Sequence, residues 1–129
     1  MSASRRTVFI VDDDEAVRHS LKLLLDTHGY DARAFATGAA FLAAVGADGR
    51  GCLVLDSGLR DMSSLDVAAA LRAKSIDLPI ILTAAVIDVR LTKDAKRLGI
   101  RYVLHKPWDC AELFKLIDEA QGPQTYVLQ

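Results

Sequence analysis

Residues that could handle phosphate and a metal ion follow three apolar segments of the sequence. Asp12 and Asp13 come directly after the apolar segment 7–11, Asp56 ends a second apolar run, and Lys106 follows a third. Carboxylates gathered in one pocket repel one another, so their natural partner is a hard divalent cation such as Mg²⁺. A lysine can hold a phosphate oxygen as a point charge. The set therefore suits phosphoryl transfer, in which catalysis consists mostly of positioning and charge neutralisation.

Parallel strands would bring these residues together, because their carboxyl ends meet at one edge of a sheet. Short apolar or β-branched runs predict strands at residues 7–11, 31–36, 52–56, 79–84 and 100–104. Apolar residues at helical spacing predict helices that begin near Ala16, Thr37, Leu65, Asp88 and Asp109. The alternation predicts an α/β fold, a doubly wound five-stranded parallel sheet with helices on both faces. Ligands of such sheets bind at the carboxyl ends of the strands, near the switch point in strand order.

Capping residues mark the beginnings of several predicted helices. Asp14 and Thr37 precede the first two helices, and Ser64 is a candidate cap for the third. Asp109 with Glu112 has the spacing of a capping box at the start of the last helix. Asp14 is therefore expected to serve the helix rather than the acidic pocket.

Length and composition indicate one domain in 129 residues, which is expected to cover residues 1–121 and to be followed by a C-terminal tail at residues 122–129. A net charge of -1 argues against direct nucleic acid binding by this chain and against attraction to an anionic membrane. The first apolar run is too short for a signal peptide or a spanning helix, so a cytoplasmic location is expected. Cys52 and Cys110 lack metal-ligand spacing and are expected to be free thiols.

Four motifs occur in a specific order along the chain. They are Val11 with the four acids that follow it at 12–15, the apolar run and aspartate at 52–56, the pair Met62-Ser63 and the pair Lys106-Pro107. Together they resemble the CheY-like receiver domain of two-component response regulators, which has a flavodoxin-like fold. The resemblance spans residues 8–120 and implies a cis bond between Lys106 and Pro107.

The resemblance implies a role for each matching residue. Asp56 would accept a phosphoryl group from the phosphohistidine of a histidine kinase or phosphotransfer protein. Asp13, Asp56 and the backbone carbonyl of Gly58 would ligate Mg²⁺, and Asp12 would act through water. Lys106 would pair with Asp56 or with its phosphoryl oxygens. These roles agree with the chemistry of the residues themselves, a carboxylate nucleophile, a metal clamp and a counter-charge.

One position of the resemblance has two candidate residues. The family usually places Ser or Thr at the end of the fourth strand to bind the phosphoryl group. A gapless match that fixes Asp56 and Lys106 puts Ala84 there, whereas Thr83 fits only if a deletion before it is balanced by an insertion after it. Successive strand residues point to opposite faces, so only one of the two can face Asp56. Thr83 is kept as the candidate hydroxyl.

Three further positions depart from the family pattern. The aromatic residue of the fifth strand is replaced by Val103, with Tyr102 one residue away. In the loop after Asp56 the usual proline is Arg60 and the usual glycine is Ser64. Arg60 adds a cation near the expected phosphoryl group, and the changed strand positions predict an atypical relay of the signal.

The function that the resemblance implies is a phosphoacceptor module that alters binding to a downstream protein or output domain, not a conventional enzyme. A homodimer is compatible with it. The alternative is a degenerate receiver that acts as a phosphorylation-independent interaction domain. A hydrolase or mutase with an aspartate nucleophile is a third class, but Ala16 stands where its motif after the first strand requires Thr or Val.

Overall fold

The computed structural model describes residues 6–46 and 50–121, which form one five-stranded parallel sheet with five helices. The strands are β1 (Thr7–Val11), β2 (Asp31–Phe35), β3 (Cys52–Asp56), β4 (Ile80–Ala84) and β5 (Tyr102–His105). The helices are α1 (Glu15–Thr27), α2 (Gly38–Ala44), α3 (Ser64–Ala73), α4 (Val89–Arg97) and α5 (Cys110–Gln121). The predicted doubly wound fold is confirmed. The predicted tail at residues 122–129 lies outside the described part of the chain.

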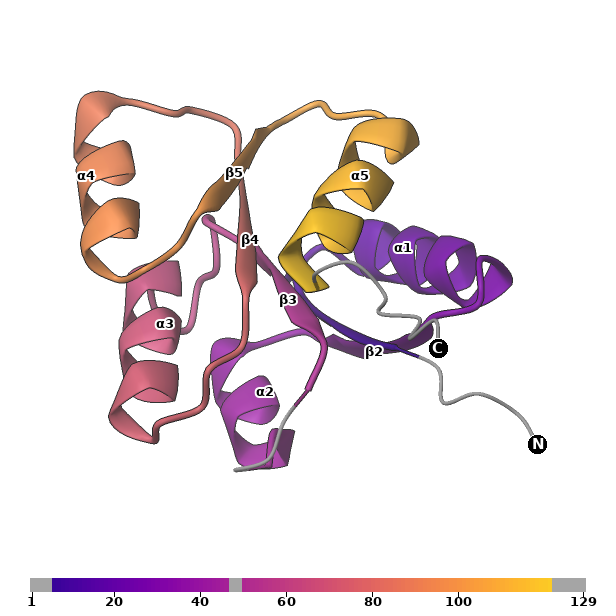
Figure 1. The fold of residues 1–129 in the computed structure, drawn as a ribbon, viewed down its shortest axis with the longest axis horizontal. Coiled ribbons are helices and arrows are strands. Elements are labelled where there is room, and N and C mark those ends of the chain that lie inside the picture. Colours follow the sequence, from indigo (N-terminus) through magenta and orange to yellow (C-terminus); the bar gives the residue numbers. More distant parts are fainter. Residues whose placement is uncertain (1–5, 47–49, 122–129) are drawn as a thin grey trace, which may run out of the picture.

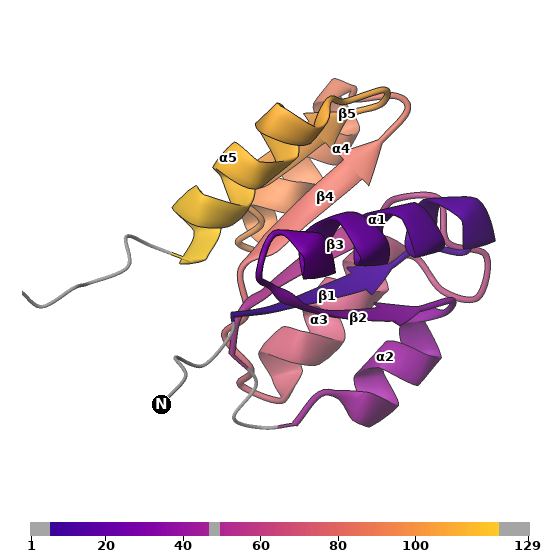
Figure 2. The ribbon, with the colours of Figure 1, turned by 90° about the vertical axis from the view of Figure 1, so that its right-hand side faces the viewer.

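The sheet separates two apolar cores. Helices α1 and α5 cover one face, and α2, α3 and α4 cover the other (Figures 1 and 2). Leu21, Leu25, Leu113 and Ile117 fill the first core, from α1 and α5. The second core is built around Phe41, Val67, Ala68, Leu71 and Ala95, from α2, α3 and α4. Both faces of the sheet are buried, which explains why its central strands are almost continuously apolar.

Strand alternation decides which side chains reach each core. Cys52 and Val54 of β3 belong to the core under α1 and α5, whereas Leu53 and Leu55 belong to the other. Asp56, the last residue of the same strand, therefore has its side chain on the α1 and α5 face. The order β2-β1-β3-β4-β5 reverses at β1, so the switch point lies between the carboxyl ends of β1 and β3.

The predicted helix caps are confirmed with one exception. The Asp14 carboxylate accepts hydrogen bonds from Ala16 N and Val17 N at the start of α1, and the Thr37 hydroxyl accepts one at α2. Asp109 and Glu112 form the expected reciprocal capping box of α5. The prediction for α3 is wrong: the cap is Ser63, whose hydroxyl accepts from Asp66 N, while Ser64 is buried as the first helical residue.

The predicted limits of β5 are also wrong. The strand covers Tyr102–His105 rather than residues 100–104. Ile100 N donates instead to Ala95 O, and Gly99 has a φ of +77°, so these residues close the end of α4. The chain joins the sheet only once that helix has ended.

Two further predictions concern the cysteine thiols and membrane-spanning segments. Both cysteines are free, and burial raises the pKa of Cys52 to about 12, which keeps its thiol protonated and inert. Cys110 is exposed. Among the described residues no helix has the length and apolar content needed to cross a membrane.

Candidate functional site

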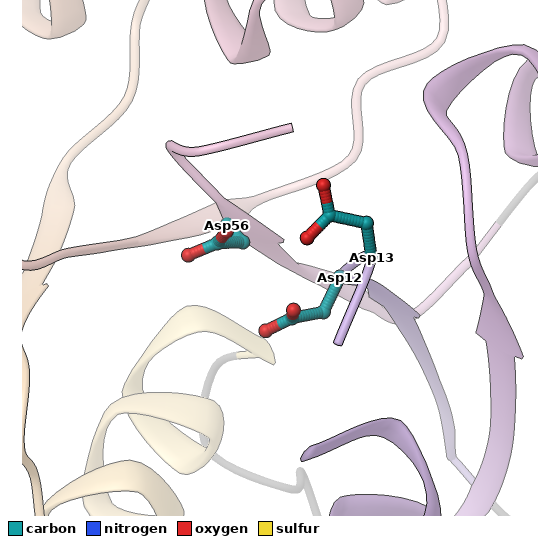
Figure 3. A group of neighbouring side chains, drawn as sticks. All are labelled: Asp12, Asp13 and Asp56. Atoms are coloured by element: carbon teal, nitrogen blue, oxygen red, sulfur yellow. The ribbon is translucent and has the colours of Figure 1, made fainter. Parts of the chain in front are cut away.

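Three carboxylates meet at the switch point of the sheet. Asp12 and Asp13 follow β1, and Asp56 ends the neighbouring strand β3. One carboxylate oxygen from each residue lies within 4.8 Å of those of the other two. Figure 3 shows the three side chains as neighbours at the two strand ends. The predicted meeting of these acids is therefore confirmed.

Asp56 is the most fully contacted of the three acids. Its Oδ1 lies 2.6 Å from Lys106 Nζ and accepts a hydrogen bond of 3.3 Å from the Thr83 hydroxyl. Its Oδ2 accepts a hydrogen bond of 3.1 Å from Gly58 N. The side chain is almost completely buried. A buried carboxylate held by three donors from different elements has a fixed position, which a reacting group requires.

Lys106 provides the positive charge of the site. It follows β5, and its bond to Pro107 is cis, as the resemblance implied. Partial burial by itself lowers the pKa of Lys106, but the hydrogen bond and the negative charge of Asp56 outweigh it, so the pKa is raised. The lysine is therefore charged at neutral pH and balances one of the three carboxylates.

The surroundings of Asp12 disfavour its charged form. Burial is the main reason that its pKa is raised, and the charges of Asp56 and Asp13 add to the effect. A hydrogen bond of 2.9 Å from Asp14 N to Asp12 Oδ1 and the charge of Lys106 act in the opposite direction. An acid in this environment gains from a nearby cation.

Asp13 leaves one oxygen without a hydrogen bond. Its Oδ2 is buried and has no hydrogen-bond partner among the described residues. This oxygen forms an exposed ion pair with Arg60, whose Nε lies 3.6 Å away. Three hard oxygen donors, one of them unsatisfied, fit the ligand preferences of Mg²⁺. The residues present are thus suited to the cation that the sequence predicted.

Strand register decides between the two candidates for the hydroxyl position. Thr83 pairs with Asp56 across β3 and β4, and its hydroxyl donates to the Asp56 carboxylate. Ala84 follows it and lies on the opposite side of the strand. The gapless match is therefore wrong at this point, because pairing with β3 rather than chain distance sets which side chain faces the acid.

The fifth strand presents Tyr102 and Val103 to different cores. Val103 packs against the core of α2, α3 and α4, while Tyr102 packs on the α1 and α5 side. Val103 also lines a pocket of about 360 Å³ with Thr92 and Ala95 of α4. Tyr102 therefore cannot substitute for an aromatic residue at position 103, because it lies on the other face of the sheet.

One contact that positions the loop between β3 and α3 has no signal in the sequence. The Asp61 carboxylate accepts hydrogen bonds of 3.1 Å from Gly38 N and Ala39 N at the start of α2. These two donors lower the pKa of Asp61. Asp61 and Gly38 are 23 residues apart in the sequence, so no local pattern signals the contact. The sequence offered only one weak sign of this contact: Asp61 is a loop acid for which no other role was predicted.

Comparison with known proteins agrees with this geometry. The family model described as the response regulator receiver domain matches residues 8–118. The chain belongs to this family. The receiver is 34% identical over 115 residues to the transcriptional regulatory protein FixJ of Azorhizobium caulinodans, covering 89% of this chain and 54% of FixJ. It is 35% identical over 114 residues to the transcriptional regulatory protein TdiR of Thauera aromatica, covering 88% and 50%.

Solved structures show the same fold. The structure described as FixJ-N superposes on the receiver with a TM-score of 0.84 and 29% identity, covering 97% of this chain and 100% of that one. The response regulator StyR gives a TM-score of 0.85 and 33% identity, covering 92% and 60%. The receiver spans about half the length of the curated relatives FixJ and TdiR.

Proposed function

We propose that this receiver accepts a phosphoryl group on Asp56 from a histidine kinase or phosphotransfer protein, with Mg²⁺ as the cofactor. The observation that carries the proposal is the environment of Asp56: a lysine and a threonine hydroxyl on one carboxylate oxygen, beside two further acids. The relatives FixJ and TdiR are described as transcriptional regulatory proteins, which supports a downstream output domain or protein partner.

In the proposed reaction, an oxygen of the Asp56 carboxylate attacks the phosphorus of a phosphohistidine. The new O–P bond forms as the P–N bond breaks, and the imidazole leaves. Lys106 and Thr83 already contact this carboxylate and would stay close to the transferred oxygens. Receivers are not conventional enzymes, because the group that reacts is the receiver's own side chain.

The acids have the role of holding the cation. Asp13, Asp56 and the carbonyl of Gly58 would ligate Mg²⁺, and Asp12 would hold it through water. The ion supplies positive charge that neutralises the phosphoryl oxygens during transfer. The unsatisfied Oδ2 of Asp13 and the raised pKa of Asp12 support this assignment, since both favour a nearby cation.

The relay of the signal is proposed to be atypical. Thr83 is in position to follow a phosphoryl group, but Val103 offers no ring beside the pocket at α4. Ser57 N and Lys106 N donate to Thr83 O and Ala84 O, so movement of β4 would be transmitted directly to both loops of the site. A backbone route of this kind does not require an aromatic switch.

The alternative is a phosphorylation-independent interaction domain. Val103 favours it, because a receiver that never switches has no need of the aromatic residue. The buried and fully contacted Asp56 weighs against it. Bringing three carboxylates and a lysine together in a partly buried site lowers the stability of the fold, and an acid that never reacts gives no functional reason for that loss.

Intact mass after treatment with acetyl phosphate tests the proposal. The wild type should gain one phosphoryl group in the presence of Mg²⁺ and none in the presence of a chelator. Asp56→Asn should gain none, while Asp109→Asn, a change at the cap of α5, serves as the matched control and should be labelled. Absence of an adduct on the wild type, or an undiminished adduct on Asp56→Asn, would contradict the phosphoacceptor role.

A further inference from the structure

The loop between β3 and α3 holds a cation beside the acids. Arg60 lies in this loop, and its Nε is 3.6 Å from Asp13 Oδ2. The arginine side chain is 92% exposed, whereas that of Asp13 is 27% exposed. The pair thus joins a solvated guanidinium to an acid at the edge of the pocket, an arrangement that can be broken without opening the core.

Contacts on both sides of Arg60 fix its place in the loop. Gly58 N donates to Asp56 Oδ2 before it, and Asp61 caps the start of α2 after it. A side chain at Gly38 would lie within 2.8 Å of Met62 and Val67, so the loop end and α2 are closely packed. The backbone of Arg60 is therefore held near Asp13, and only its side chain is free to turn away.

The negative charge of Asp13 is not balanced by Lys106, so Arg60 can neutralise it. Lys106 contacts Asp56 and balances one negative charge, while Asp13 Oδ2 is buried and has no hydrogen-bond partner among the described residues. Among the residues that the structure describes, Arg60 is the cation within ion-pair distance of that oxygen. A divalent ion ligated by Asp13 would meet the same oxygen and would be repelled by the guanidinium.

We propose that Arg60 is a built-in competitor of the divalent cation: its guanidinium neutralises Asp13 while the site holds no metal and must turn away when the metal binds. The inference rests on the proposed Mg²⁺ site. Arg60 therefore weakens Mg²⁺ binding, and replacement by a neutral side chain strengthens it. Because the pair is exposed, the effect is about two- to fivefold in the dissociation constant, and salt screens it.

Calorimetric titration with MgCl₂ tests the competitor role at low ionic strength. The variants are Arg60→Gln, Arg60→Lys and Arg97→Gln. Arg97 also pairs with an acid, Asp94, at an exposed position, but it lies at the end of α4 that is remote from the strand carboxyl ends. Arg97→Gln thus changes the net charge equally and leaves the site intact. Arg60→Lys keeps the charge beside Asp13.

The expected result is a dissociation constant two- to fivefold lower for Arg60→Gln, with Arg60→Lys and Arg97→Gln within about 1.5-fold of the wild type. Equal affinity of Arg60→Gln and wild type would overturn the competitor role and leave the metal site standing. An equal gain in Arg60→Lys or Arg97→Gln would also overturn it, since charge at this position would not be the cause. Absence of Mg²⁺ binding by the wild type would instead reject the metal site of the proposed function.

Discussion

The acidic site and the neighbouring segment that leads from β4 into the start of α4 are built in opposite ways. Asp12 and Asp56 are charged and only 5% and 6% exposed. Val86 and Val89, close by in the chain after β4, are apolar and both 70% exposed. One region buries charge against its preference for water, and the other exposes apolar surface.

The difference separates a site that the sheet holds in place from a segment that contributes little to the core. Strand ends and a network of donors hold the acids, so their arrangement is set by the sheet. The two valines contribute little to the core, because most of each side chain is exposed. Charge changes should therefore alter stability strongly at the site, while polar changes at the valines should alter it little.

Lys106→Met is expected to change the stability of the site more than the other substitutions proposed for the acids and their contacts. It removes the counter-charge of Asp56 and should lower the free energy of unfolding by about 2 kcal/mol, less than for a fully buried pair because Lys106 is partly exposed. Urea denaturation without Mg²⁺ measures the change, with the exposed Lys93→Met as control. The pKa of Lys106 is raised, so its contribution is complete below pH 10.5 and is lost as pH rises through the folded value. Equal losses in both variants would show that Asp56 does not depend on this charge.

Asp12→Asn is expected to stabilise the receiver without metal by about 1 kcal/mol at neutral pH. Asn keeps an acceptor for Asp14 N and removes a buried charge. Because the pKa of Asp12 is raised, its ionised form destabilises the folded state above that pKa, and the advantage of the variant should shrink as pH falls through it. Urea denaturation at several pH values tests this, with the exposed Asp66→Asn as control. A variant no more stable than wild type at neutral pH would contradict the argument.

Thr83→Ala tests the hydroxyl on Asp56. The variant should lose about 0.5–1 kcal/mol more stability than Thr83→Ser, because Ser keeps the donor to Asp56 Oδ1 and loses only a methyl group. Thermal and urea unfolding compare the two variants directly. Equal losses would mean that the hydroxyl makes no net contribution at this position.

Val86→Ser and Val89→Ser are expected to have the smallest effect, within about 0.5 kcal/mol of the wild type, because both side chains are exposed. The same substitution at the buried Val54 is the matched control and should cost more than about 2 kcal/mol. Urea denaturation measures all three. A large loss at Val86 or Val89 would show that this segment supports the fold, and the proposed contrast would then be wrong.

Much of the fold could be predicted from the sequence because its signals are local. Apolar runs of strand length ending in acids, and helices with caps such as Asp14 and Thr37, alternate regularly along the chain. The alternation requires a parallel sheet, and a parallel sheet brings Asp12, Asp13 and Asp56 to one edge. The error at the cap of α3 arose because two adjacent serines offer the same local signal.

The sequence by itself determined the number and order of the strands, the order of the acids along them and the family resemblance. Tertiary structure alone decided that Thr83 rather than Ala84 faces Asp56, and that Asp13 meets Arg60. The physical reason is the same in both cases. Which strand residue faces a site depends on its register with the neighbouring strand, as for Thr83 opposite Asp56. Which loop residue faces a site depends on where the loop is anchored, and Asp61 anchors the loop that carries Arg60 on α2. Such pairings join residues distant in the chain, and no spacing within the sequence records them.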